Sequence, residues 1–266
     1  MKTAKHPTGL TINFNEKEHR YVDENNNVYN SVTSVIHSLF PKFDAEKISV
    51  FVARKRGCTQ TEVLNEWEEK RSSSSNFGDK IHNYAECLLT QKTFVDNYNK
   101  NTFDYQQKEK GYLKQTEEII PKLLKCYDLI GAEKIIFSPD NKLSGTIDIL
   151  MRNKRTKTLA IFDWKTNEEI RNLNKHKATQ TGLYSLSHIP DANFYHYALQ
   201  LNTYRKILIN EKYFEDTNFE MAIFHIQENK IVPYKLPLLE KESDYILEAA
   251  KKMNGESNEN SLYDNN

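Results

Sequence analysis

The chain has 266 residues, 28% of them charged, and its 37 basic and 37 acidic side chains give a formal net charge of zero. A nucleic-acid-binding protein with this balance must concentrate its basic groups locally. The three cysteines, Cys58, Cys87 and Cys126, are far apart in the sequence, which disfavours a disulfide framework, a zinc site and an iron–sulfur cluster.

The first thirty residues are predicted to form an N-terminal arm with short strands. Residues 1–9 are expected to be a loose arm. Short strands are predicted at residues 11–14, 19–22 and 28–29. Ser31 or Thr33 then supplies the N-cap of a helix, which Pro41 ends because proline cannot continue it.

A helical region follows, in which one helix carries three chemically notable positions. Helices are predicted at residues 45–56, 61–71 and 76–90. The serine run 72–75 is expected to separate the second helix from the third and to provide the N-cap of the third. Gly57 is expected to end the first of them. In the third, Gly78, His82 and Glu86 share one face, because residues four apart are neighbours on a helix. A lone helical histidine is more often structural than a ligand. Residues 104–130 are predicted to be mostly helical, with a kink at Pro121.

Three consecutive strands are predicted at residues 132–138, 142–151 and 158–166. The last two form a hairpin, and each carries an aspartate, Asp148 or Asp163, where the apolar pattern expects a hydrophobic residue. The period of two in a strand places Asp163 and Lys165 on one face. If the two strands pair, Asp148 lies next to Asp163. Glu133, at the start of the first strand, is expected to be an exposed residue at a strand edge.

Two crowded carboxylates repel each other unless a cation or a proton lies between them. Mg²⁺ suits such a site, because it takes oxygen ligands and usually binds one or two carboxylates plus substrate phosphates. A lysine beside it can orient or deprotonate a water and stabilise negative charge on a phosphate. Taken alone, Asp163 and Lys165 would more often be a surface ion pair; the second aspartate on the neighbouring strand favours a functional site.

The rest of the chain is predicted to contain a long loop, a helix, a hairpin and a final helix. Residues 167–195 form a connection that is either functional or disordered. Its position directly after the strand that carries Asp163 and Lys165 favours a function for it, with Lys175 and Lys177 facing a substrate. Gln200 and Tyr204 share a face of the next helix, in which Tyr197 belongs to the buried stripe. The remaining elements are predicted at residues 195–210, 219–227, 230–236 and 239–253, before a disordered tail, 254–266.

Four short motifs resemble those of one nuclease family. Asp148 followed by Asp163-Trp164-Lys165 resembles the bipartite motif of the PD-(D/E)XK nuclease superfamily. Three further motifs resemble its RecB-like exonuclease branch, above all phage recombination-type and mitochondrial genome maintenance exonucleases. They are Gly78-Asp79-Lys80-Ile81-His82 with Glu86, Gly145-Thr146-Ile147-Asp148 and Gln200-Leu201-Asn202-Thr203-Tyr204. The resemblance spans Tyr29 to Ile209. Ile147 stands where the superfamily often has proline, a difference that this branch commonly tolerates.

This resemblance implies a fold, a reaction and a set of site residues. The fold would be α/β, with a PD-(D/E)XK core, a mixed sheet flanked by helices, and an N-terminal helical elaboration in one nuclease domain, residues 31–253, whose catalytic core spans about 76–236. The reaction would be metal-dependent hydrolysis of DNA by an exonuclease. The implied site residues are the metal ligands His82, Asp148, Asp163 and the backbone carbonyl of Trp164, the catalytic residues Lys165 and Gln200, the supporting residues Glu86, Glu133 and Tyr204, and the DNA-binding residues Lys175 and Lys177.

The implied cofactor is Mg²⁺ or Mn²⁺, and the implied partner is single-stranded DNA or DNA ends, together with recombination or replication proteins. The chain carries no P-loop motif, signal peptide or membrane-spanning apolar run, so we expect an intracellular, soluble protein without a bound nucleotide. Two alternatives stay open. One is a structure-specific endonuclease or an RNA nuclease, and the other is a DNA-binding or assembly module with a decayed site.

Overall fold

The computed structural model describes residues 2–15, 18–97, 103–172 and 178–263, with side chains described except in 103–107 and 255–263. Within these residues the strands are β1 (Lys2–Lys5), β2 (Thr11–Asn15), β3 (Arg20–Asp23), β4 (Val28–Ser31), β5 (Tyr127–Ser138), β6 (Leu143–Asn153), β7 (Leu159–Lys165), β8 (Phe219–Ile226) and β9 (Ile231–Lys235). The helices are α1 (Val32–Ser38), α2 (Ala45–Arg56), α3 (Gln60–Thr90), α4 (Phe103–Cys126), α5 (Asn193–Asn210) and α6 (Glu240–Tyr263), with one 3-10 turn, η1 (Tyr184–Leu186).

The strands form one mixed sheet, in the order β1-β2-β3-β4-β6-β7-β8-β9, with β5 paired along β6. Strands β1 to β4 are an antiparallel meander, and β4 then pairs in parallel with the start of β6. Strand β7 is antiparallel to β6 and parallel to β8, which follows it through the crossover helix α5. The predicted α/β class with one mixed sheet flanked by helices is confirmed.

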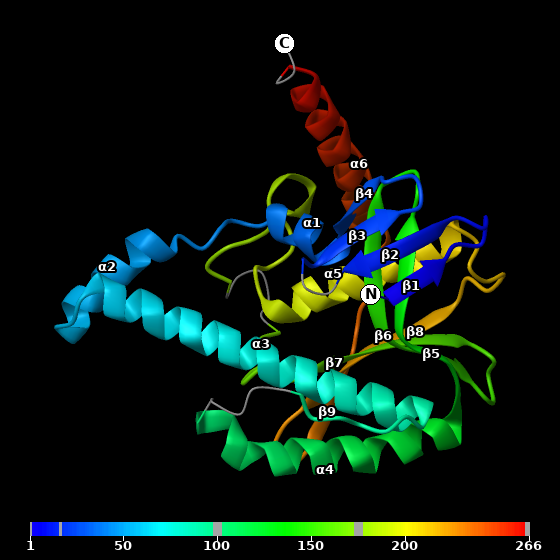
Figure 1. Cartoon of the computed structure of the whole chain (residues 1–266), viewed down its shortest axis with the longest axis horizontal. Coiled ribbons are helices and arrows are strands. Elements are labelled where there is room, and N and C mark those ends of the chain that lie inside the picture. Colours follow the sequence, from blue (N-terminus) through cyan, green and yellow to red (C-terminus); the bar gives the residue numbers. More distant parts are fainter. Residues whose placement is uncertain (1, 16–17, 98–102, 173–177, 264–266) are drawn as a thin grey trace.

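Helices cover the central strands on both faces (Figure 1). Helices α1, α5 and α6 pack on one face over a core that includes Leu143 and Ile161, whereas α3 and α4 pack on the other over Ile149, Phe162 and Trp164. Strands buried on both faces read as continuous apolar runs, which explains why an aspartate in β6 or β7 stands out in the sequence.

Several local predictions are confirmed at the level of single residues. The side chain of Ser31 caps α1 by accepting a hydrogen bond from the amide of Ser34, and α1 ends before Pro41. Gly57 ends α2 in the left-handed conformation, with φ of 71°, which glycine adopts without steric cost. The hairpin of β8 and β9 and the strands β2 to β4 also form where the sequence predicts them.

The predicted break at the serine run is wrong, because α3 runs without interruption for 31 residues through Ser72–Ser75. Serine is only a moderately poor helix former, and the packing of α3 against α2 and α4 outweighs this preference. The first half of α3 and α2 project from the body as an arm, which we call the α2–α3 arm (Figure 1).

Other element boundaries also differ from the predictions. Residues 2–5 are a strand, not a loose arm, because β1 finds a partner in β2. Strand β5 begins at Tyr127, where helix was predicted, because it pairs with β6 to its end at Asn153. Helix α6 continues to Tyr263, past its predicted end at residue 253. Across the described residues, none of the helices combines the length and the apolar character needed to cross a membrane.

Candidate metal centre

The two aspartates meet where the ladder between β6 and β7 ends. Ile149 pairs with Phe162, so the next register position sets Asp148 opposite Asp163. There the side chain of Asp148 takes part in the hydrogen bonding between the two strands, because its Oδ2 accepts a hydrogen bond from the backbone N–H of Trp164 at 2.8 Å. Lys165 Nζ lies 2.5 Å from Asp163 Oδ2. The predicted hairpin and the predicted placement of Asp163 and Lys165 side by side on one strand are therefore confirmed.

Strand β6 is irregular at Asp148. Its odd-numbered residues Leu143 and Ile147 pack in the core beneath α5, whereas Ile149 and Met151, of the same parity, pack in the core beneath α3 and α4. The strand therefore changes faces at Asp148. Strand β4 pairs with β6 up to Ser144 and β7 pairs from Ile149 onward, so residues 145–148 lie in the gap between two partner strands.

Glu133 and His82 complete a cluster around Asp148. Glu133 lies between Ala132 and Lys134, which pair with Ile149 and Ile147 on either side of Asp148. Glu133 takes a φ of 48°, which is uncommon for a residue with a side chain. The Nδ1 atom of His82, on α3, lies 3.3 Å from Asp148 Oδ2 and 3.7 Å from Glu133 Oε1. One ligand atom from each of these three residues lies within 4.8 Å of the other two.

The expectation that Glu133 is an exposed strand-edge residue is wrong. Its side chain is only 19% exposed and faces His82. The cause is the local backbone of β5 together with its register on β6. Neither can be predicted from Glu133 and its sequence neighbours.

Burial and crowding control the charges in this cluster. Burial and, after it, the neighbouring charge of Asp148 together raise the pKa of Asp163 to about 6 against the opposing effect of Lys165. Burial also raises the pKa of Asp148. Burial lowers the pKa of His82, but Asp148 and Glu133 outweigh that effect and raise it to about 9. Burial likewise opposes the charge of Lys165, yet Asp163 and Asp148 raise its pKa, so the ammonium stays protonated.

Helix α5 contributes aromatic side chains beside the cluster. Tyr204 is buried against Gly145, where a Cβ atom would lie 2.3 Å from its ring. Gln200 Nε2 donates a hydrogen bond to Tyr204 Oη at 2.9 Å. The ring centroid of Tyr197 lies 4.5 Å from Lys165 Nζ. The sequence pattern places Tyr197 only in the buried stripe of its helix, because a helix face does not reveal its tertiary neighbours.

The remaining predicted site residues lie apart from the cluster or outside the described part of the chain. Glu86 forms ion pairs with Lys92 at 3.4 Å and Lys2 at 3.8 Å. Lys175 and Lys177 lie outside the described residues. A side chain that the sequence did not single out also borders the motif around Asp148, because Tyr21 Oη lies 3.0 Å from Thr146 Oγ1.

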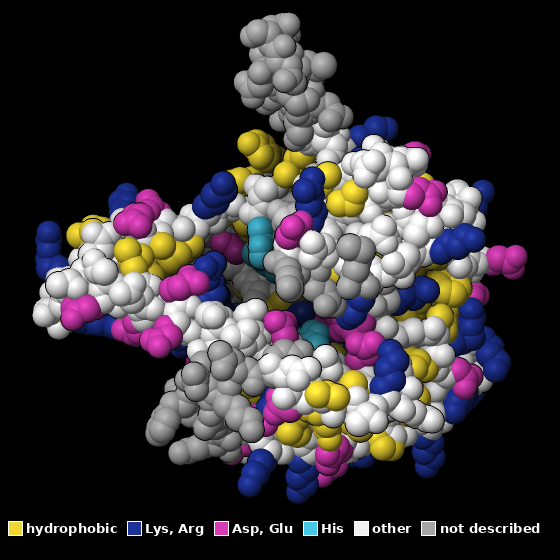
Figure 2. Space-filling model, in the orientation of Figure 1, with side chains coloured by type: hydrophobic (Ala, Val, Ile, Leu, Met, Phe, Trp, Pro, Cys, Tyr) yellow, Lys and Arg dark blue, Asp and Glu magenta, His cyan; other side chains and the backbone are white. Residues whose placement is uncertain are grey.

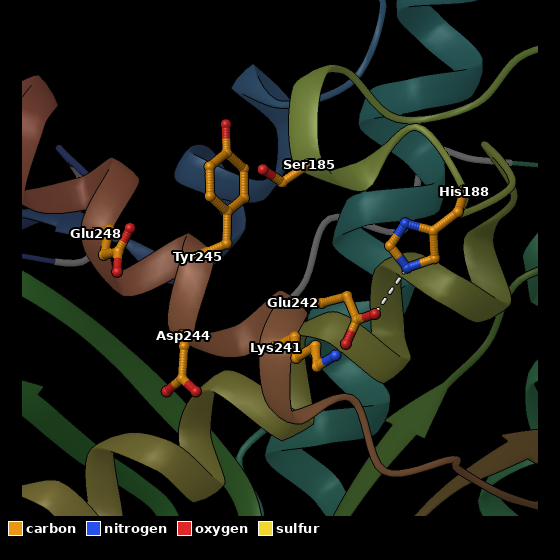
Figure 3. A pocket seen from close by; sticks show the side chains of 7 residues that line it. All are labelled: Ser185, His188, Lys241, Glu242, Asp244, Tyr245 and Glu248. Carbon is orange, nitrogen blue, oxygen red and sulfur yellow. Dashed lines mark hydrogen bonds and ion pairs between the residues drawn. The ribbon is translucent and has the colours of Figure 1, made fainter.

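A separate hollow of about 650 Å³ opens between η1 and α6 (Figure 3). His188 Nε2 faces Glu242 Oε1 there at 2.7 Å, while the hydroxyl of Ser185 points toward the ring of Tyr245. Three carboxylates and one lysine line it, and a phosphate would meet repulsion from the carboxylates. This acidic hollow is therefore a poor site for a nucleic-acid backbone.

The donor atoms of the central cluster fit a divalent cation. Oxygen from two carboxylates and nitrogen from one imidazole suit Mn²⁺, and carboxylates alone suit Mg²⁺. The pKa values of Asp163 and Asp148 are raised, which means that their ionised forms are destabilised. A positive charge between such crowded, buried carboxylates would stabilise them. Trp164 lies beside the site through its backbone, whereas its indole packs in the core with Phe224.

Comparison with models of known protein families finds no match for this chain, and no curated protein matches it either. Any function must therefore be inferred from the residues of the chain and their geometry.

Proposed function

We propose that the protein is a metal-dependent nuclease of the PD-(D/E)XK kind that hydrolyses phosphodiester bonds in DNA, acting as an exonuclease on single strands. One observation carries the proposal: His82, Glu133, Asp148, Asp163 and Lys165 come from α3, β5, β6 and β7 and gather at one point of the sheet. Two buried aspartates gathered with a partly buried glutamate, imidazole and ammonium are costly to assemble unless the group binds or transforms something.

The residues divide the chemical work between them. His82, Glu133 and Asp148 would hold Mg²⁺ or Mn²⁺, with Asp163 beside them. When bound, such an ion polarises a phosphate oxygen and lowers the pKa of an attacking water. Lys165 is held protonated by Asp163 and Asp148, which favours orientation of water and stabilisation of phosphate charge over proton abstraction.

Helix α5 acts on this site through packing. Tyr204 fills the space over Gly145 in the gap between β4 and β7, and Gln200 holds its hydroxyl. Tyr197 lies under the ammonium of Lys165, where the face of an aromatic ring favours a cation. The contact with Tyr197 helps to fix the direction of Lys165.

The test is digestion of end-labelled linear single-stranded DNA and of a circle of the same sequence, with Mg²⁺, Mn²⁺, Ca²⁺ or EDTA. We expect degradation of the linear strand with Mg²⁺ or Mn²⁺, no reaction with EDTA, and an intact circle. Asp163→Asn should abolish cleavage, whereas Glu86→Gln, a carboxylate outside the cluster, should retain it.

Other results would assign a different activity. Cutting of the circle at the same rate would replace the exonuclease by an endonuclease, and preferential cleavage of RNA would change the substrate. Binding of DNA without cleavage under any metal condition would indicate a DNA-binding module with a decayed site.

A further inference from the structure

The face of α3 that carries His82 continues outward along the α2–α3 arm. Trp67, Arg71, Ser74, Gly78 and His82 follow one another at intervals of three or four residues, so their side chains share one side of the helix. Trp67 precedes His82 by 15 residues, which is about 22 Å along a helix. The catalytic end of α3 and its outer end are thus joined by one continuous surface.

The outer end of this surface carries two aromatic rings, of which Phe43 is exposed and Trp67 is partly exposed. Phe43, just before α2, is 66% exposed, and its ring centroid lies 5.6 Å from that of Trp67 at an interplanar angle of 58°. The two rings, with Lys70, Arg71 and Ser74, line a hollow of about 380 Å³. In Figure 2 hydrophobic side chains gather on this arm beside basic ones. Apolar side chains that stand together on a surface mark interaction sites, whereas single ones need no such explanation.

A second hollow joins this surface to the segment that follows Lys165. It has a volume of about 320 Å³, and it is lined by Lys70 and Ser74 from α3 and by Thr166, Asn167, Glu168 and Glu169, which directly follow Lys165. Asn167 Oδ1 accepts a hydrogen bond from Tyr197 Oη at 2.7 Å, and the Tyr197 ring lies under the Lys165 ammonium. Lys70 and Ser74 therefore border both hollows, which form a path between the aromatic pair and the catalytic strand.

The cations on this path are available to a new partner. Arg71 pairs with Glu68 at 2.6 Å and Lys70 pairs with Glu168 at 3.4 Å, and all four side chains are well exposed. Exposed ion pairs contribute little free energy, so a phosphate can replace either carboxylate at small cost.

We propose that Phe43 and Trp67 form a stacking platform for the bases of single-stranded DNA, with Lys70 and Arg71 contacting its phosphates. This inference rests on the proposed function and extends it, because it names where the strand lies on its way to the metal centre. Aromatic rings stack any base, and flanking cations follow the backbone, which is how proteins hold single strands without reading sequence. The distance between platform and metal centre suits a strand of about four nucleotides or more.

The experiment measures binding of an oligo-dT strand of about 12 nucleotides in EDTA, so that cleavage does not enter. Phe43→Ala is the main variant, because an exposed side chain can be removed without unfolding the protein. Phe51→Ala is its matched control: Phe51 is 63% exposed on the same arm but lines neither hollow. We expect about tenfold weaker binding for Phe43→Ala and unchanged binding for Phe51→Ala.

Two further measurements use the same titration. The chain has two tryptophans, and Trp164 is only 1% exposed, so quenching of fluorescence by the strand reports stacking on Trp67. Lys70→Gln should lower the slope of log affinity against log salt by about 0.7, the value for one lost phosphate contact on a single strand.

Binding that is equal in wild type, Phe43→Ala and Phe51→Ala would overturn the platform and leave the nuclease proposal standing. A wild-type protein that does not cleave DNA, but whose oligonucleotide binding depends on Phe43, would overturn the nuclease proposal and leave the platform standing. A wild-type dimer that Phe43→Ala dissociates, with binding of the strand unchanged, would assign the patch to self-association and also overturn the platform.

Discussion

The substitution Gly145→Ala tests the packing around the candidate site most directly. A Cβ atom at position 145 would lie 2.3 Å from Cε1, 2.9 Å from Cζ and 3.0 Å from Oη of Tyr204. Carbon atoms in contact prefer about 3.5–4.0 Å, so the ring must move by more than 1 Å, roughly the shortfall at its nearest atom. Tyr204 is buried in the core beneath α5 and has little room to do so.

The expected cost is about 1–3 kcal/mol of unfolding free energy, the range for overpacking a well-filled core. Backbone strain does not contribute, because Gly145 has no positive φ. Urea denaturation gives the difference in unfolding free energy from the shift of the midpoint at constant slope. Gly78→Ala is a control of opposite sign: its Cβ would lie 3.5 Å from Thr166 Oγ1, an ordinary contact, and alanine in a helix is favoured by about 1 kcal/mol.

A double-mutant cycle with Tyr204→Leu separates the clash from other effects. Leucine lacks the three ring atoms that the new methyl group would meet, so Gly145→Ala should cost little in that background. We expect a coupling energy of about 1–2 kcal/mol, within the range for residues in direct contact. An equal loss of stability from Gly145→Ala in both backgrounds would refute the idea that Tyr204 sets the requirement for glycine.

The remaining predictions concern the cluster itself and one buried carboxylate. Lys165→Ala should lower the cleavage rate by about 10²-fold or more while calorimetry shows nearly unchanged Mn²⁺ affinity, because lysine is not a ligand. His82→Ala should be rescued by Mn²⁺ more than by Mg²⁺ if imidazole is a ligand, since Mn²⁺ accepts nitrogen more readily; equal cleavage by wild type and variant in Mg²⁺ would return His82 to a structural role. Glu133→Gln should weaken Mn²⁺ binding about tenfold, and Glu86→Gln should not; equal affinities in the two variants would remove Glu133 from the ligand set. Burial raises the pKa of Asp23, but its hydrogen bonds outweigh that effect and hold the pKa below its ordinary value. The stabilising effect of the Asp23 carboxylate is therefore complete above about pH 5 and declines as the pH falls. Asp23→Asn should therefore cost about 2 kcal/mol at pH 7 and less at pH 3 in urea titrations, and a loss that stays constant over this pH range would contradict the assignment.

Period-two geometry explains why part of the site could be predicted from the sequence alone. Asp163 and Lys165 share a strand face whatever the rest of the fold does, and a hairpin between two apolar runs brings Asp148 alongside. Local signals also sufficed for the cap at Ser31 and the end of α2 at Gly57, because their hydrogen bonds and dihedral angles involve only near neighbours in the chain.

Contacts between distant segments decided the rest. Glu133 joins the cluster through the register of β5 on β6 and its own positive φ, and Tyr197 reaches Lys165 only because α5 crosses over β7. The serines at 72–75 stay helical because packing of α3 outweighs their weak local preference. Phe43 and Trp67 come together from either side of α2. Local residue preferences are worth a few tenths of a kcal/mol each, whereas burial of one large side chain is worth about 1.5–3 kcal/mol; where the two disagree, the tertiary structure prevails.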